Sequence, residues 1–193
     1  MIKRAVEALL AGHVVVIPTD TVYGIAALPE IPAAVQAVFR AKGRTADKPL
    51  PVLAASASDL ADVAILNERG KKLAERFWPG PLTLVLPRAP AFIHDLGGNE
   101  GATVAVRVPD NVITFELLQA TGPLAVTSAN LSGHPPATTL RAARAALGGA
   151  VEVGIDGGTC DGAPSSVVRL VDGPVEMRAG PIALDAIEKA LRN

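Results

Sequence analysis

Several turns of this 193-residue sequence carry hydroxyl, amide or cationic side chains directly after an apolar run. The first of these turns, residues 18–24 (PTDTVYG), follows the run 14–17 and holds two threonines, a carboxylate and a phenol. Ligands of α/β proteins usually bind at the loops that follow strands, so this turn is a candidate binding loop. The alternative is a turn whose hydroxyl groups bond to its own backbone.

The second polar segment, residues 40–49, carries four cations and one acid in a chain whose net charge is −1. Gly43 and Pro49 break a helix here, which would place the cations on a loop able to fold over an anion. Arg44 offers a planar pair of donors to phosphate or carboxylate, and Lys42 and Lys48 add point charges. A solvated charged face is the alternative.

A third candidate is Arg107, which lies in the alternating apolar segment 103–108. In a strand, Arg107 would share one face with Thr103 and Ala105, while three valines occupy the other face. Small neighbours leave room for a pocket above the arginine, and a buried guanidinium needs an anionic partner. A ligand carboxylate or phosphate would be that partner. The alternative is a solvated arginine on an edge strand.

Three further polar positions lie beside strand-like runs. In segment 127–133 the side chains of Ser128 and Asn130 would point the same way and could donate to a phosphate or carboxylate. Ser165 precedes the run 166–171, and Arg178 lies at the end of the last run. Together these turns predict an anion-binding pocket lined by Thr, Ser, Asn, Arg and Lys.

Motifs of several other site classes are missing from the sequence. It contains no GxxxxGK[ST] phosphate loop, no GxGxxG after a strand, no HExxH and no GxSxG. The three histidines stand far apart. Cys160, Asp156 and Asp161 fit a glycine-rich turn better than a nucleophile or a calcium loop. We therefore expect neither a covalent nucleophile nor a metal held by a cluster of protein ligands.

The composition indicates a folded chain without a membrane span. Hydrophobic residues make up 49% of the sequence and the mean hydropathy is +0.34, which excludes a disordered chain. The apolar runs fall short of the roughly 18 residues that a spanning helix needs. Aromatic residues, at 3%, are too few for a base-stacking surface. A single cysteine and the lack of a signal-like N-terminus favour the reducing cytoplasm.

The elements that must position these side chains alternate between helices and strands. Periodicity predicts helices at 2–11, from 32 onward, at 67–78, 110–119, 139–147 and 183–191. It predicts strands at 14–17, 51–54, 82–86, 103–108, 124–127, 151–155, 166–171 and 174–178. Asn67 and Asp110 are expected to be N-caps, and Thr139 to open a helix. The pattern favours one α/β domain over residues 1–193, with a twisted sheet of parallel and antiparallel strands flanked by helices.

Six segments occur in the order found in the YrdC family, which the chain therefore resembles over nearly its whole length. They are 18–24 (PTDTVYG), 42–44 (KGR), 79–83 (PGPLT), 107–109 (RVP), 128–133 (SANLSG) and 178–180 (RAG). The resemblance implies a YrdC-like fold with a large basic concave cavity. It also implies a nucleotidyltransferase that condenses L-threonine, bicarbonate and ATP to threonylcarbamoyl-AMP and pyrophosphate, for the N6-threonylcarbamoyladenosine modification of tRNA.

The resemblance also implies roles for individual residues. Lys42 and Arg44 would be catalytic residues beside the phosphates. The expected threonine contacts are Thr21, Arg107, Ser128 and Ser165. The expected ATP contacts are Arg44, Lys48, Thr103, Asn130, Thr138 and Arg178. Mg²⁺ would arrive with ATP, held mostly by the nucleotide and water.

Partners and differences from the family follow from the same resemblance. The product would pass to other proteins of the tRNA threonylcarbamoyl-transfer machinery, and weak RNA binding is a further expectation. Leu53 stands where some relatives have histidine, and Ser166 where the family often has threonine. We also expect that the extra C-terminal domain of the family's longer form is absent.

Two other functions remain open at this point. The first is an RNA-binding module that uses the same basic cavity, against which the near-zero net charge and the scarcity of aromatic residues count. The second is a carbamoyl-transfer domain like that of hydrogenase-maturation proteins, although the zinc-finger and acylphosphatase modules that accompany such domains are missing from this sequence.

Overall fold

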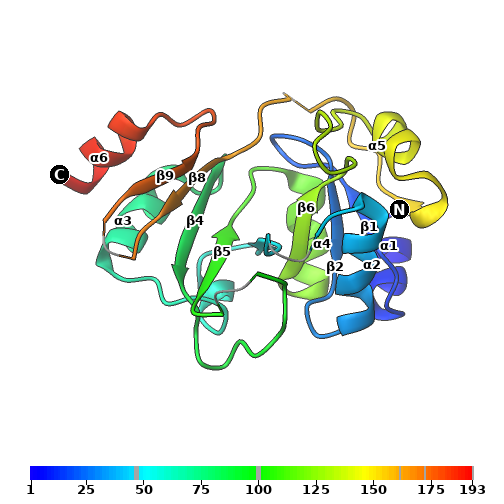
Figure 1. Ribbon diagram of the computed structural model, residues 1–193, viewed down its shortest axis with the longest axis horizontal. Helices are drawn as coiled ribbons and strands as arrows, with labels where there is room; N and C mark the ends of the chain where they lie inside the picture. The colour runs from blue at the N-terminus through cyan, green and yellow to red at the C-terminus, as the bar shows by residue number, and fades with distance from the viewer. Residues whose placement is uncertain (46–47, 99–100, 161, 172, 193) are drawn as a thin grey trace.

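A nine-stranded sheet organises the computed structural model of the chain (Figure 1). The structure describes residues 1–45, 48–98, 101–160, 162–171 and 173–192. The strands are β1 (Val15–Ile17), β2 (Gly24–Ala27), β3 (Val52–Leu53), β4 (Leu82–Pro87), β5 (Thr103–Arg107), β6 (Leu124–Ser128), β7 (Val153–Gly154), β8 (Ser166–Arg169) and β9 (Val175–Arg178). The helices are α1 (Ile2–Leu10), α2 (Pro32–Lys42), α3 (Glu68–Phe77), α4 (Val112–Thr121), α5 (Leu140–Leu147) and α6 (Leu184–Arg192), with 3-10 turns η1 (Ser58–Leu60) and η2 (Gly148–Ala150).

The strand order is β7-β1-β2-β6-β3-β5-β4-β8-β9. The pairs β1–β7, β3–β5 and β4–β8 are parallel, whereas β1–β2, β2–β6, β3–β6, β4–β5 and β8–β9 are antiparallel. The predicted single α/β domain with a mixed sheet is therefore confirmed. The register places Gly24 opposite Ser128 and Leu82 opposite Ser166, so the sheet brings together polar turns that are distant in sequence.

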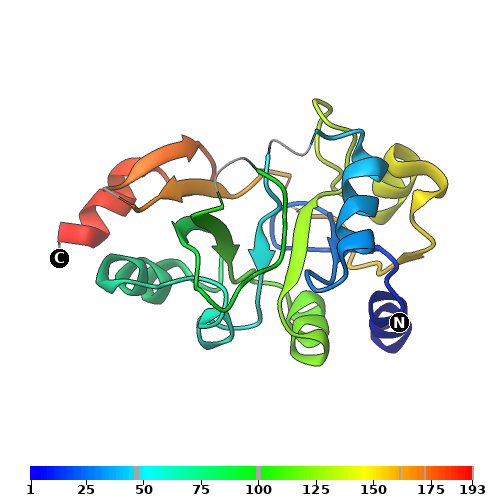
Figure 2. The same cartoon turned by 60° about the horizontal axis from the view of Figure 1, so that its bottom comes forward.

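Helices cover the two faces of the sheet unevenly. In Figure 2, α1, α4 and α3 lie along the lower face, and α2 and α5 lie over the upper face of the half that contains β1, β2 and β6. Helices α1 and α4 contact each other, as do α3 and α6. Among the described helices, none covers the face of β4 and β5 that is opposite α3 (Figure 2). Thr83 and Val85 of β4 and Ala105 and Arg107 of β5 line a cavity on that face.

Alternation along the central strands separates the core from this open face. On β5, Val104 and Val106 are buried in the hydrophobic core, whereas Ala105 and Arg107 line a cavity on the other side. Strand β4 repeats the pattern, with Leu84 in the core and Thr83 at the cavity. The face assignments predicted for segment 103–108 are confirmed, because successive side chains of a strand point to opposite faces.

Side-chain caps define where three helices begin. Asn67 accepts a hydrogen bond from Gly70 N at 2.9 Å, and Thr139 accepts one from Ala142 N at 3.2 Å, as predicted. The predicted cap Asp110 is wrong, since α4 starts one residue later and Asn111 Oδ1 accepts from Thr114 N at 3.1 Å. Both residue types favour N-caps, so the sequence alone did not separate the two neighbours.

Strand β2 was not predicted from the sequence. Its four residues, GIAA, are all buried and show no polar alternation, and β2 follows β1 after a short turn as its antiparallel neighbour. A short run buried on both faces carries no period-two signal, which explains the omission. Among the described residues, no helix is long and apolar enough to cross a membrane.

Candidate active site

A cavity of about 530 Å³ opens on the uncovered face of the sheet. Its walls come from the turn after β1, the loop after α2, strands β4 to β6, and the segments at β8 and β9. Seven of the eleven site residues predicted from the sequence line it: Thr21, Arg44, Lys48, Arg107, Ser128, Ser165 and Arg178. The described lining residues include four cations and no carboxylate. These chain segments therefore meet at one site, although they are far apart in sequence.

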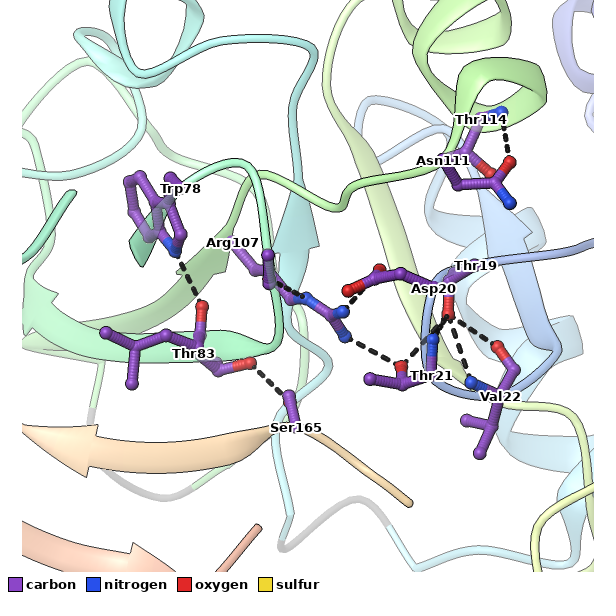
Figure 3. Close-up of polar contacts among 12 residues, drawn as sticks. Thr19, Asp20, Thr21, Val22, Trp78, Thr83, Arg107, Asn111, Thr114 and Ser165 are labelled. Carbon is purple, nitrogen blue, oxygen red and sulfur yellow. Dashed lines mark hydrogen bonds and ion pairs between the residues drawn. The ribbon is translucent and has the colours of Figure 1, made fainter. Parts of the chain in front are cut away.

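Arg107 lies in the wall of this cavity and is held from three sides (Figure 3). Its Nη1 donates to Thr21 Oγ1 at 3.0 Å, and its Nε donates to the Gly80 carbonyl at 2.9 Å. Its Nη2 forms an ion pair with Asp20 Oδ1 at 2.5 Å. The sequence predicted a ligand carboxylate or phosphate as the partner of Arg107; the structure adds Asp20 as an anionic partner from the protein itself.

Burial lowers the pKa of Arg107 below its usual value, and the adjacent charge of Asp20 acts in the opposite direction. A guanidinium starts from a pKa so high that it stays protonated in proteins. Arg107 therefore stays a charged donor within a wall where only 5% of its surface is exposed. Sequence reasoning missed Asp20 as a site residue, although it lies inside the 18–24 motif.

The 18–24 turn bonds to itself and also supports the site. Thr19 Oγ1 accepts from the backbone N–H groups of Thr21 and Val22, both at 3.2 Å, and donates to the Val22 carbonyl at 2.6 Å. The hydroxyl groups of Thr19 and Thr21 lie 3.0 Å apart. The interpretation as a turn that bonds to its own backbone is confirmed for Thr19. Thr21 contacts Arg107 and lines the cavity, so ligand binding by this turn stays a prediction (Figure 3).

A second polar cluster joins Ser165, Thr83 and Arg178. The hydroxyl groups of Thr83 and Ser165 lie 2.8 Å apart (Figure 3). Arg178 donates to the Ser165 carbonyl from Nε and Nη2, and from Nη2 to the Ser165 hydroxyl at 3.0 Å. Burial lowers the pKa of Arg178. Thr83 was not assigned a role from the sequence, although it ends the quoted 79–83 segment.

Arg44 connects the loop after α2 to strand β6. Its Nη1 donates to Thr127 Oγ1 at 3.1 Å, and its Nε and Nη2 donate to the Lys48 carbonyl at 3.2 and 2.9 Å. The helix ends at Gly43, whose φ of 56° lies in the left-handed region that glycine adopts easily. The predicted break at Gly43 is confirmed, and it allows Arg44 to turn toward the cavity.

Lys42 is buried at the last turn of α2 and does not line the cavity. Its ammonium donates to the carbonyl oxygens of Ser128 and Asn130, the latter at 2.7 Å. Burial, followed by the nearby charge of Arg44, lowers the pKa of Lys42 to about 8. Lys42 therefore fixes the turn after β6 from behind.

The other three predicted ATP contacts also lie away from the cavity lining. Asn130 is buried and donates from Nδ2 to the carbonyls of Leu131 and His134, while its Oδ1 is buried without a partner among the described atoms. Thr138 accepts from Cys160 N at 2.9 Å through its carbonyl. Thr103 begins β5, roughly 14 Å along the strand from Arg107 at about 3.4 Å per residue.

The described residues contain no group of three or more His, Cys, Asp or Glu side chains placed to hold a metal ion. Asp20 is engaged by Arg107. The described residues therefore fit no resident Mg²⁺. Asp161, which was assigned to a turn together with Asp156, lies outside the described residues. The remaining lining residues that sequence reasoning missed are mainly small or apolar: Gly24, Val85, Val126, Val167 and Met177.

Comparison with known proteins gives consistent matches over the whole chain. The family model Sua5_yciO_yrdC, described as "Telomere recombination", matches residues 7–180. A protein from Mycobacterium tuberculosis, provisionally named threonylcarbamoyl-AMP synthase, is 42% identical over 98% of this chain and 88% of its own length. The threonylcarbamoyl-AMP synthase of Pyrococcus abyssi is 40% identical over 98% of this chain, which spans 57% of that protein.

Solved structures agree with these matches. The P. abyssi Sua5 structure complexed with L-threonine superposes with a TM-score of 0.92 at 40% identity, covering 98% of this chain and 56% of that one. Escherichia coli YciO superposes with a TM-score of 0.88 at 26% identity, covering 96% and 92%. The resemblance inferred from the six motifs is thus confirmed, and the curated names are those of an enzyme of the nucleotidyltransferase kind. This chain belongs to the Sua5/YciO/YrdC family.

Proposed function

We propose that this chain is a threonylcarbamoyl-AMP synthase. It condenses L-threonine, bicarbonate and ATP to threonylcarbamoyl-AMP, pyrophosphate and water. The observation that carries the proposal is that one cavity gathers Arg44, Lys48, Arg107 and Arg178 with the hydroxyl groups of Thr21 and Ser165. The relatives that bear this enzyme name at 40–42% identity support the same activity.

The reaction needs a site of this composition. The threonine amine attacks the carbon of bicarbonate and water leaves, or it adds to carbon dioxide from dehydrated bicarbonate and loses a proton. Either route gives a carbamate. A carbamate oxygen then attacks the α-phosphorus of ATP, and pyrophosphate leaves. ATP, bicarbonate and the carboxylate of threonine carry negative charge, so the protein must gather them and neutralise the charge that develops. Cations with hydroxyl donors perform this task without a covalent nucleophile.

The proposed threonine contacts are Thr21, Arg107, Ser128 and Ser165. Arg107 keeps donors beyond those used by its protein partners, and such donors suit the carboxylate of an amino acid. Threonine binding in the related P. abyssi structure supports this assignment. The proposed role of Ser165 depends on its hydroxyl, which Thr83 and Arg178 hold in the wall.

The proposed ATP contacts divide into two groups. Arg44, Lys48 and Arg178 line the cavity and supply positive charge for the phosphates. Asn130, Thr138 and Thr103 lie outside the lining, so their contribution requires nucleotide atoms beyond the cavity or support of the neighbouring turns. Mg²⁺ enters as part of the nucleotide substrate, because the described residues fit no resident ion.

Arg44 and Lys42 are the proposed catalytic pair. Arg44 contacts the cavity directly and stabilises charge on the transferred phosphoryl group. Lys42 donates from behind to the carbonyls of Ser128 and Asn130, so its charge would act through the turn that carries Ser128. The placement of Lys42 thus favours a positioning role over direct contact with phosphate.

Product identification tests the proposal. The purified chain is incubated with ATP, MgCl₂, L-threonine and ¹³C-bicarbonate, and the products are separated and weighed by mass spectrometry. We expect an adenylate that contains threonine and one ¹³C atom. Adenylate without the ¹³C label, or hydrolysis of ATP without any threonine adduct, would contradict the assignment.

The cellular setting is part of the same proposal. The product would pass, in the cytoplasm, to proteins that transfer the threonylcarbamoyl group to tRNA. An RNA-binding role is tested by titrating salt into a mixture of the chain and tRNA, since phosphate contacts weaken steeply with salt. Weak binding with a shallow salt dependence would leave synthesis as the main role.

A further inference from the structure

Asp20 has no place in the ligand contacts proposed above. Its side chain is 14% exposed, and its carboxylate lies 2.5 Å from Arg107 Nη2. Thr19 and Thr21, on either side of it, line the cavity, whereas Asp20 does not. Figure 3 shows the Asp20 carboxylate beside the guanidinium, on the side away from Thr83 and Ser165. Asp20 therefore acts on the cavity through Arg107.

The contacts of Arg107 leave a defined set of donors. A guanidinium has five N–H groups. The described residues take one from Nε, one from Nη1 and one from Nη2, through Gly80, Thr21 and Asp20. One N–H on each terminal nitrogen remains. Three anchors on one planar group fix its orientation, so the two remaining donors have fixed directions.

Net positive charge is distributed unevenly along the cavity wall. Asp20 balances Arg107, so this part of the wall offers hydrogen-bond donors with no excess charge. Lys48 and Arg178 form no ion pair with any described residue. A polyanion is attracted in proportion to net positive charge, so triphosphate or pyrophosphate favours Lys48 and Arg178 over Arg107, whose charge Asp20 balances. A single carboxylate can still use the donors of Arg107.

We propose that Asp20 is a positioning residue that fixes Arg107 and cancels its charge, so that this wall binds the carboxylate of an amino acid and disfavours polyphosphate. The proposal rests on the proposed function, because it assigns the two substrates to different parts of one cavity. It explains why a partly buried carboxylate lies beside a cation that binds an anionic group.

Two substitutions distinguish loss of the charge from a shift in its position. Asp20→Asn removes the negative charge and also weakens the anchor on Arg107, because a neutral amide oxygen accepts a weaker hydrogen bond than a carboxylate does. Asp20→Glu keeps the charge but moves it by one methylene group. Glu68→Gln is the matched control, since Glu68 pairs with Lys71 on the exposed face of α3 and its side chain is 86% exposed. Thermal unfolding of each variant is recorded first.

The readouts are the calorimetric Kd values for L-threonine and for pyrophosphate. For Asp20→Asn we expect threonine binding about tenfold weaker and pyrophosphate binding about fivefold tighter, since the wall gains one net positive charge. For Asp20→Glu we expect threonine binding about tenfold weaker and pyrophosphate binding unchanged. Glu68→Gln should match the wild type in both. A merely structural role for Asp20 would not move the two affinities in opposite directions.

The outcomes decide between the claims. Wild-type affinities in Asp20→Asn, or equal weakening of both ligands in a folded Asp20→Asn variant, would overturn the role of Asp20. If Asp20→Asn does not fold, unaltered threonine binding by Asp20→Glu would overturn the proposed role of Asp20. A wild-type chain that does not bind threonine would also overturn that role. A wild-type chain that binds threonine but makes no adenylate refutes the proposed function alone. In that case the Kd values for L-threonine and pyrophosphate still test the role of Asp20.

Discussion

Arg178 bonds to both oxygen atoms of Ser165, thirteen residues earlier in the chain. Its Nε and Nη2 donate to the Ser165 carbonyl at 3.0 and 2.8 Å, and Nη2 also donates to the hydroxyl at 3.0 Å. The same hydroxyl lies 2.8 Å from that of Thr83. Hydrogen bonds thus join Thr83, Ser165 and Arg178 into one wall of the cavity. Any change that shifts Arg178 should also shift Ser165.

Gly180 makes this wall possible. A Cβ atom at this position would lie 2.7 Å from the Pro164 carbonyl and would also collide with the backbone of Ser166. Gly180→Ala should therefore displace the backbone and cost about 1–3 kcal/mol of unfolding free energy, as overpacking does. Urea denaturation measures this loss, and threonine binding should weaken with it. The control is Gly149→Ala, because a Cβ there meets no atom within 4 Å. Equal stability of the two variants would contradict the close approach at Gly180.

Arg107→Met should abolish threonine-dependent synthesis and also destabilise the fold. Breaking a buried ion pair costs about 3–5 kcal/mol when one partner is left alone, and the lower end applies because the Asp20 side chain is 14% exposed to solvent. The rate of pyrophosphate release should fall by about 100-fold or more. The double variant Asp20→Asn with Arg107→Met should recover part of the stability and none of the activity. No recovery of stability would mean that the two residues are not coupled.

Lys42 should make activity and stability respond to pH in opposite directions. Its pKa is about 8 in the folded protein, compared with 10.5 for an ordinary lysine. Between pH 8 and about 10 the unfolded chain binds more protons at this residue, so stability should rise with pH. The positive charge behind the Ser128 turn is lost over the same interval, so pyrophosphate release should decline as pH rises through about 8.

The variant Lys42→Met tests both halves of this prediction. It should lack the rise in urea midpoint between pH 7.5 and 9.5 and should be less active at every pH, because its charge is gone. Lys189→Met, at an exposed position of α6, serves as the control and should follow the wild type. A variant at position 42 with the wild-type pH profile would show that Lys42 does not control either property.

Removal of Mg²⁺ should affect catalysis without affecting the fold. The described residues hold no cluster of metal ligands, so the ion is expected to travel with ATP. EDTA should stop pyrophosphate release, while the melting temperature and the Kd for L-threonine remain unchanged. A lower melting temperature in EDTA would indicate a metal bound by the protein itself.

Much of the fold could be predicted because local signals were strong. Asn67 and Thr139 precede helical periodicity, and both cap their helices. The alternation around Arg107 assigned the correct faces of β5. Prediction failed where the signal was ambiguous or absent. Asp110 and Asn111 are equally good caps, and β2 is too short and too uniformly buried to show a period.

The site was predictable in its residue types and less so in its contacts. The polar turns at strand ends identified seven residues that line one cavity. Which side chains pair with each other depends on the sheet register, which the sequence does not reveal locally. The sequence therefore did not identify Asp20 as the partner of Arg107. It also predicted Lys42 at the phosphates, whereas Lys42 lies behind the Ser128 turn. Tertiary packing determines the positions of both side chains.

Pyrophosphate release by the purified chain tests the central claim most directly. The assay contains ATP and MgCl₂ and is run with L-threonine and bicarbonate together, with each alone, and with neither. Release that requires both threonine and bicarbonate, and that Arg107→Met abolishes in a folded protein, is the predicted result. Release that is independent of threonine, or no release by a folded sample that binds ATP and threonine, would contradict the account.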